Sequence, residues 1–220
     1  MNWSVLTGDI VESSAMPADV LDAIMRDVRE VSLECSGWGH SDDENTITGF
    51  ARRGGDGWQI AINRPAFALR FCLYIKARLR LMNSEYSTRI AVASGEGELP
   101  DMISDSSKTA DGLAFADLNS AHGPAFMASG RLLEELAGDT LMAHADGGAM
   151  DAAFRLADYI SHSWTQAQAR SLCLMLPPGA GPRRVAAEQI GISRQAVDQA
   201  LNSAGYPAIM AAIEAIEAME

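Results

Sequence analysis

The chain has few of the features that mark secreted, membrane or metal-binding proteins. It contains no apolar run of about 18 residues, which predicts that no segment spans a membrane. Residues 1–7 lack the basic stretch followed by an apolar one that a signal peptide requires. The three cysteines and four histidines show no metal-ligand spacing, and we expect the cysteines to be reduced and mostly buried. These absences favour a cytoplasmic protein.

Positive charge is also scarce, with 17 lysine and arginine residues against 29 aspartate and glutamate residues. The resulting net charge of −12 argues against a nucleic-acid partner, because phosphates repel an acidic surface. The acidity is concentrated in residues 1–164, which hold 13 basic and 24 acidic side chains. Residues 165–206 hold four arginines and two carboxylates, a local net charge of +2. The C-terminal part is therefore compatible with DNA.

Hydrophobic patterning predicts an α+β protein in which strands and helices alternate. Patterns typical of strands cover residues 3–11, 46–50, 58–62, 88–93 and 140–145. Helical spacing begins at Pro17 and Pro65 and returns over residues 125–136 and 149–164. This order predicts an antiparallel or mixed sheet with helices packed on it. We expect one domain over residues 1–164 and a second over residues 165–220.

Residues 183–202 have the pattern of two helices joined by a tight turn. The first helix can bury Val185, Ala186 and Ile190, and the second can bury Val197, Ala200 and Leu201. Gly191 is suited to end the first helix, and Ser193 to cap the second. The segment resembles the helix-turn-helix family, whose characteristic positions here hold Ala187, Gly191, Ile192 and Val197. The alternative is an ordinary pair of packed helices without a DNA partner.

The helix-turn-helix resemblance implies that the second helix enters the major groove of DNA. Its outward polar side chains, which would read the bases, are Ser193, Arg194, Gln195, Gln199 and Asn202. Arg183 and Arg184, at the start of the first helix, would contact phosphates. Asp198 is less suited to this surface, since it repels phosphate, although it can accept a hydrogen bond from a cytosine amine.

A last helix is predicted after Tyr206 and Pro207. Its apolar stripe consists of Ile209, Met210, Ile213, Ile216 and Met219. Such a stripe either packs on the core or forms a contact between two copies of the chain. Helix-turn-helix proteins commonly bind DNA as dimers, so a homodimer is expected.

Two aspartates of the N-terminal part lie where strand ends can bring them together. Asp9 lies at the end of the first predicted strand, and Asp56 lies in the glycine-rich hairpin of residues 54–57. Carboxylates on adjacent strand ends can hold Mg²⁺ with a nucleotide, and glycines let the backbone approach that ligand. Both aspartates are equally compatible with ordinary turn positions.

Several stretches resemble the class III nucleotide cyclase homology domain, and more closely the SatD family. They read GDIVESS, TITGFARRGGDGWQIAI, STRIAVASGEG and HGPAFMASGRLLEEL, together with DGLAF at residues 111–115. The resemblance covers about residues 2–145. It implies a ferredoxin-like βαββαβ core with extra elements, followed by the all-α helix-turn-helix domain.

The resemblance implies that Asp9 and Asp56 are metal ligands, with Gly8, Ile10 and Gly55 beside the nucleotide. Arg52 takes the position of the base-selecting lysine, and Ser120 lies near the other base-selecting position. Arg131 matches the arginine that stabilises the transition state, but Met127 stands where its partner asparagine belongs. Losing such a polar group costs a factor of about 10² to 10³ in rate. We therefore expect a degenerate domain that senses a nucleotide or mediates dimerisation.

Three functions remain open on the sequence. The first is a DNA-binding transcription regulator whose N-terminal domain binds a nucleotide-type small molecule or dimerises. The second is an active nucleotide cyclase that carries the helix-turn-helix as a localising module, and the third is a non-catalytic partner-binding protein. Asp9 and Asp56 favour the first two, Arg52 and Met127 favour the first over the second, and the overall acidity favours the third.

Overall fold

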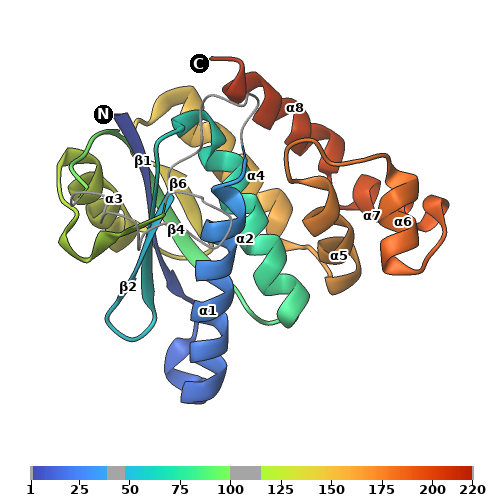
Figure 1. Cartoon of the computed structure of the whole chain (residues 1–220), viewed down its shortest axis with the longest axis horizontal. Helices are drawn as coiled ribbons and strands as arrows, with labels where there is room; N and C mark the ends of the chain where they lie inside the picture. Colours follow the sequence, from blue (N-terminus) through green and yellow to red (C-terminus); the bar gives the residue numbers. More distant parts are fainter. Residues whose placement is uncertain (1, 39–47, 100–114, 220) are drawn as a thin grey trace.

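The computed structural model describes residues 2–38, 48–99 and 115–219 as an α+β fold, which confirms the predicted class (Figure 1). Its sheet has the strand order β5-β2-β3-β1-β4-β6. The central strand β1 (Asn2–Ile10) runs antiparallel to both β3 (Gly57–Ile62) and β4 (Thr88–Glu96). β2 (Thr48–Arg53) forms a hairpin with β3. Two short strands add in parallel at the edges: β5 (Phe115–Asp117) on β2, and β6 (Met142–His144) on β4.

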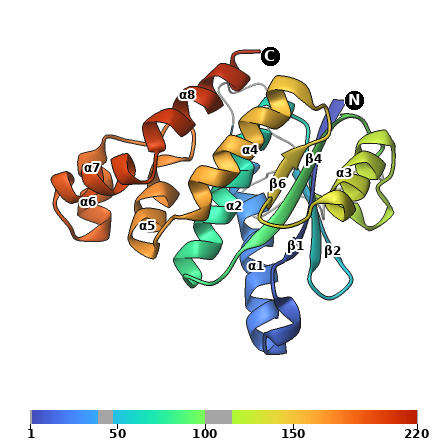
Figure 2. The same ribbon diagram turned by 180° about the vertical axis from the view of Figure 1, so that it is seen from behind.

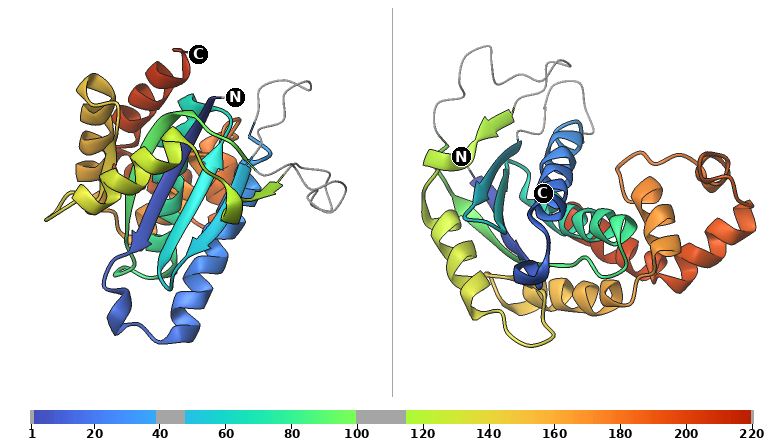
Figure 3. Two further views of the ribbon diagram at one scale, coloured as in Figure 1. Left: turned by 90° about the vertical axis from the view of Figure 1, so that its left-hand side faces the viewer. Right: turned by 90° about the horizontal axis from the view of Figure 1, so that it is seen from below.

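Helices cover both faces of the sheet (Figure 3). α1 (Ala18–Cys35) and α2 (Ala68–Met82) pack on one face, where Leu6 and Ile60 are buried. α3 (Pro124–Glu135) packs on the other face, where Val5 and Phe126 are buried. The alternation of side chains along β1 therefore separates two layers of core. Three single 3₁₀ turns join these elements: η1 (Ser13–Ala15), η2 (Pro65–Phe67) and η3 (Leu118–Ser120).

Residues 148–162 pack against β6 and α2, and the residues after 165 lie at one side of the molecule, beyond α2 (Figures 1 and 2). This C-terminal part of the chain is helical. It consists of α4 (Gly148–His162), α5 (Gln166–Met175), α6 (Arg183–Ile190), α7 (Arg194–Ser203) and α8 (Tyr206–Glu217). A capping box starts α5, because the Thr165 hydroxyl accepts from the Gln168 amide while the Gln168 side chain accepts from the Thr165 amide. None of the described helices combines the length and apolar composition needed to cross a bilayer.

Packing is continuous across the boundary predicted at residues 164–165, which falls between α4 and α5. One core cluster contains Leu6 and Phe71 of the sheet region together with Val197 and Ile213 of the helical region. The Trp164 indole donates a hydrogen bond of 2.9 Å to the carbonyl of Ala204. The α7–α8 junction is therefore tied to the end of α4.

The apolar stripe of α8 packs on this same core. Ile209, Ile213 and Ile216 are buried, whereas Met219 remains exposed. Buried Arg70 of α2 donates to both carboxylate oxygens of Glu217 at 2.6 and 2.8 Å, which holds the end of α8 on the sheet region. The stripe was predicted either to pack on the core or to contact a second copy of the chain, and the structure shows it packed on the core.

Gly8, predicted to lie beside a nucleotide, has a packing role in the sheet. A Cβ built on it would lie 2.3 Å from Cζ2 of Trp58 and 2.5 Å from the carbonyl oxygen of Arg89. The Trp58 ring is fully buried, and its N–H donates to the hydroxyl of Thr88 at 3.0 Å. The tryptophan therefore cannot move aside without breaking this bond.

Replacing Gly8 with alanine is expected to lower the free energy of unfolding by about 1–3 kcal/mol, because the extra methyl overpacks the core. Urea denaturation followed by circular dichroism measures the change. Gly55→Ala is the matched control, since nothing lies within 4 Å of a Cβ at that position. Equal effects of the two substitutions would contradict the packing role of Gly8.

Candidate nucleic-acid interface and acidic site

The two helices α6 and α7 are joined by a turn whose backbone geometry follows from two residues. Gly191 ends α6 with a φ of +78°, a left-handed conformation that glycine adopts without steric cost. The amides of Gly191 and Ile192 both donate to the carbonyl of Ala187, at 2.9 and 3.1 Å. The Ser193 hydroxyl accepts from the amide of Ala196 at 3.1 Å and so caps α7. Both predicted roles, the stop at Gly191 and the cap at Ser193, are confirmed.

Small and branched side chains hold the two helices together and attach them to α5. Ala186 and Ala187 are buried on α6, and Val197 and Leu201 are buried on α7. Val185, Ile190 and Ala200 of the predicted inner faces are only partly buried. The buried side of α7 is therefore narrow, and most of its circumference faces solvent.

The exposed side of α7 carries the side chains that were predicted to read bases. Arg194, Gln195 and Gln199 are exposed, and Asn202 is exposed at the C-terminal end of the helix, where it borders a cavity against α4. Ser193 is exposed as well, but its hydroxyl oxygen is engaged by the cap. On α6, Arg184 is exposed and pairs with Glu188 one turn further on.

Asp198, the one acidic side chain of α7, lies between two arginines. Arg183 donates to one of its oxygens at 2.7 Å, and Nε of Arg194 lies 3.6 Å from the other. These pairs offset the negative charge of Asp198, so its repulsion of a phosphate backbone is weakened. Arg194 itself is 72% exposed, which leaves most of its guanidinium open to a ligand.

The structure brings the backbones of Asp9 and Asp56 together. Asp9 is opposite Gly57 in the β1–β3 register, and the amide of Ile10 donates to the carbonyl of Asp56 at 3.2 Å. Ile10 itself is buried in the core, whereas Gly55 is exposed at the tip of the hairpin. The proximity of the two aspartates follows from the hairpin and from the antiparallel pairing of its second strand with β1.

Both carboxylates are already engaged by other side chains. Arg89 of β4 donates to both oxygens of Asp9, with Nε at 2.8 Å from Oδ1. Hydrogen bonding to Asp9 raises the pKa of Arg89. Asp56 accepts a hydrogen bond from the hydroxyl of Ser13. Sequence reasoning missed Arg89, because only the β1–β4 register places it opposite Asp9.

This arrangement does not fit the Mg²⁺ ion that the resemblance implied. Mg²⁺ requires a near-octahedral set of oxygen ligands, and Asp9 offers its oxygens to Arg89 instead. Within residues 2–38, 48–99 and 115–219, no three His, Cys, Asp or Glu side chains gather as a metal site. A cation at Asp9 would have to displace the guanidinium of Arg89.

The other residues matched to the cyclase set do not converge on Asp9. Arg52 pairs with Asp22 of α1 at 2.7 Å, so it lies on the face of the sheet that α1 covers. Asp9 is on the opposite face, where the neighbouring Thr7 contacts Ser129 of α3 at 2.7 Å. Arg131, Met127 and Ser120 are exposed, with Met127 at 67%. Residues 111–114 of the DGLAF stretch lie outside the described part of the chain.

The helix pair α6–α7 and the carboxylates of Asp9 and Asp56 are the two candidate sites of the chain. Neither protein-family models nor curated proteins match its sequence. The function is therefore inferred from the chemistry of the residues described above.

Proposed function

We propose that the chain is a DNA-binding transcription regulator, with a degenerate cyclase-type domain over residues 1–164 and a helix-turn-helix domain over residues 165–220. The observation that carries this proposal is the exposed polar face of α7, which a glycine turn and a serine cap connect to α6. Arg194, Gln195 and Gln199 on that face supply the guanidinium and amide groups that pair with guanine and adenine. Arg183 and Arg184 supply positive charge for phosphates at the start of α6.

The strand order of the N-terminal region favours a cyclase-type fold, whereas its side chains do not favour cyclase activity. The element order β1-α1-β2-β3-α2-β4 and the sheet order β2-β3-β1-β4 support the proposed ferredoxin-like arrangement. The pairing of Asp9 with Arg89 argues against a metal ion at that carboxylate, and Met127 cannot supply the polar group of a catalytic asparagine. The domain is therefore proposed to sense a nucleotide-type ligand or to mediate homodimerisation, and not to turn over a nucleotide.

A gel-shift assay of the purified protein with its own upstream DNA tests this function. We expect a specific shift that weakens as the salt concentration rises, because arginine–phosphate contacts release counterions. A scrambled DNA fragment of the same length and composition is the control. The absence of a specific shift at both low and moderate salt would contradict the proposed function.

A further inference from the structure

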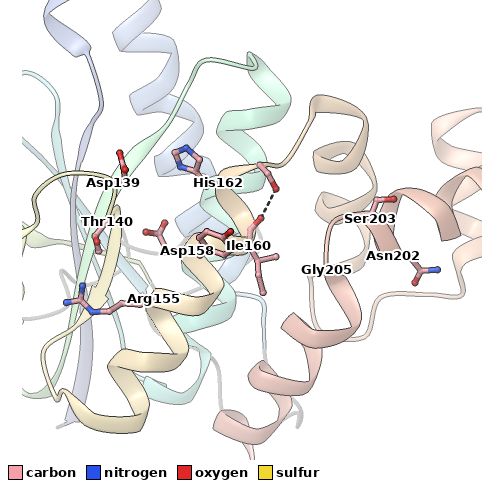
Figure 4. A pocket seen from close by; sticks show the side chains of 11 residues that line it. Asp139, Thr140, Arg155, Asp158, Ile160, His162, Asn202, Ser203 and Gly205 are labelled. Atoms are coloured by element: carbon pink, nitrogen blue, oxygen red, sulfur yellow. Dashed lines mark hydrogen bonds between the residues drawn. The ribbon is translucent and has the colours of Figure 1, made fainter.

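A cavity of about 720 Å³ lies between α4 and the junction of α7 with α8 (Figure 4). Tyr159 and His162 of α4 border it on one side, and Asn202 and Ser203 of α7 border it on the other. Asp139 and Thr140, just before β6, also line it. Its volume is that of a site for a small organic molecule. The cavity therefore lies between residues that follow the sheet and α7, the helix that is proposed to read DNA.

The α7–α8 junction is held tightly on α4 next to this cavity. Gly205 has a φ of +73°, and a Cβ built on it would lie 2.7 Å from Cγ2 of Ile160. The Trp164 indole holds the adjacent carbonyl of Ala204 at 2.9 Å. A molecule in the cavity would therefore contact α7 at Asn202 and Ser203, next to the point where the helix is attached to α4.

Acidic side chains outnumber lysine and arginine side chains among the described residues that line the cavity. Arg155 donates to Asp151 at 2.6 Å, and it is the only lysine or arginine among the residues that line the cavity. The buried carboxylate of Asp158 pairs with Lys76 and accepts from the amides of Leu141 and Met142. The described lining residues therefore include two aspartates and one arginine, and the cavity lacks the excess of positive charge that a triphosphate requires.

The remaining lining groups suit an uncharged, planar ligand. Asn202, Ser203 and Thr140 offer amide and hydroxyl groups as hydrogen-bond donors and acceptors. The Tyr159 side chain is 83% exposed, which leaves its ring free to stack on an aromatic ligand. A nucleoside combines an aromatic base with hydroxyl groups and no net charge.

We propose that this cavity is the effector site of the regulator and that it binds a nucleoside-sized, uncharged aromatic ligand whose occupancy changes the DNA affinity of α7. The proposal rests on the DNA-binding function proposed above. It places the sensed ligand between α4 and α7, away from Asp9 and Asp56.

Covalent filling of the cavity tests the coupling without knowledge of the natural ligand. Ser163, which lines the cavity at the end of α4, is replaced by cysteine and labelled with pyrene maleimide. Cys35 and Cys72 are buried, and burial raises the pKa of Cys173 to about 12, so the native thiols react slowly. Leu156→Cys with the same label is the matched control, because Leu156 is exposed on α4 but does not line the cavity.

Labelling at position 163 is expected to change the dissociation constant for DNA at least about fivefold, a typical allosteric coupling. The label at position 156 is expected to leave that constant within about twofold. Equal DNA affinity of the Ser163→Cys protein before and after complete labelling would overturn the coupling. If the unlabelled wild-type protein does not bind DNA, the proposed function is contradicted instead. Ligand binding in the cavity is then tested by calorimetry alone.

Isothermal titration calorimetry with adenosine, guanosine, cytidine and uridine, and with their 5′-triphosphates, tests the class of ligand. At least one nucleoside is expected to bind more tightly than its triphosphate. Tyr159→Ala is expected to weaken that binding about tenfold, the effect of losing one stacking contact, while Leu156→Ala leaves it unchanged. Absence of binding by all four nucleosides would overturn the proposal. So would triphosphate binding that Asp56→Ala abolishes and Tyr159→Ala preserves, since the ligand would then lie at the acidic site.

Discussion

Replacing Asp158 with alanine is expected to lower the free energy of unfolding by about 3–5 kcal/mol, because it leaves a buried ammonium group without its partner. The side chains of Lys76 and Asp158 are only 6% and 5% exposed. Burial already lowers the pKa of Lys76, and Asp158 is the main group that opposes this shift. The second oxygen of Asp158 also accepts from the amides of Leu141 and Met142, at 2.7 and 3.1 Å. The substitution therefore removes a charge partner and two acceptor contacts at the start of β6.

Urea denaturation followed by circular dichroism measures the effect of Asp158→Ala. Asp22→Ala is the matched control, since it breaks the exposed pair with Arg52, and exposed pairs contribute about 0–1 kcal/mol. The double variant Lys76→Met with Asp158→Leu removes both charges and is expected to be more stable than Asp158→Ala alone. A loss in Asp158→Ala no larger than that in Asp22→Ala would show that the buried pair contributes little.

The double variant Arg194→Ala with Gln199→Ala is expected to weaken specific DNA binding at least about thirtyfold. Each base contact of this kind contributes about 1–3 kcal/mol, and both side chains are exposed on the same helix. Neither side chain is part of the buried contact of α7, which consists of Val197 and Leu201, so the fold is expected to persist. Fluorescence anisotropy with specific and scrambled DNA measures the change, and circular dichroism verifies the helix content.

Two further substitutions separate base reading from general electrostatics. Arg26→Ala removes an exposed arginine of α1 and is expected to leave DNA affinity within about twofold. Arg184→Ala is expected to weaken binding to all sequences alike and to reduce the slope of affinity against salt by about one. If the double variant on α7 binds its operator as tightly as the wild type, α7 does not read DNA.

Much of the local structure could be predicted because short-range chemistry specifies it. Gly191 adopts a positive φ and Ser193 caps α7, as the residue types required. The α+β class followed from alternating and helical apolar spacing, and the backbones of Asp9 and Asp56 meet because a short hairpin leads into the strand that pairs with β1. The exposed polar side of α7 also follows from helical periodicity, since Val197 and Leu201 are four residues apart.

The predictions that depended on distant partners were less complete. Arg89 lies 80 residues after Asp9, and only the β1–β4 register places it against that carboxylate. Arg52 and Asp9 were both assigned to one nucleotide site, yet Arg52 pairs with α1 and Asp9 faces α3. Neither β5 nor α5 was predicted. Three residues of strand leave a weak periodic signal, and the Thr165–Gln168 capping box that begins α5 was overlooked.

The sequence by itself determined the helices other than α5, the turn between α6 and α7, and the polar side of α7, because backbone preferences and periodicity act over a few residues. The tertiary structure alone decided which charges meet. It paired Asp9 with Arg89, buried Lys76 against Asp158, and packed the stripe of α8 on the core. It also created the cavity between α4 and α7 from two segments that end at Ser163 and begin at Asn202. Such contacts depend on strand register and helix packing, which bring together residues that are distant in the chain.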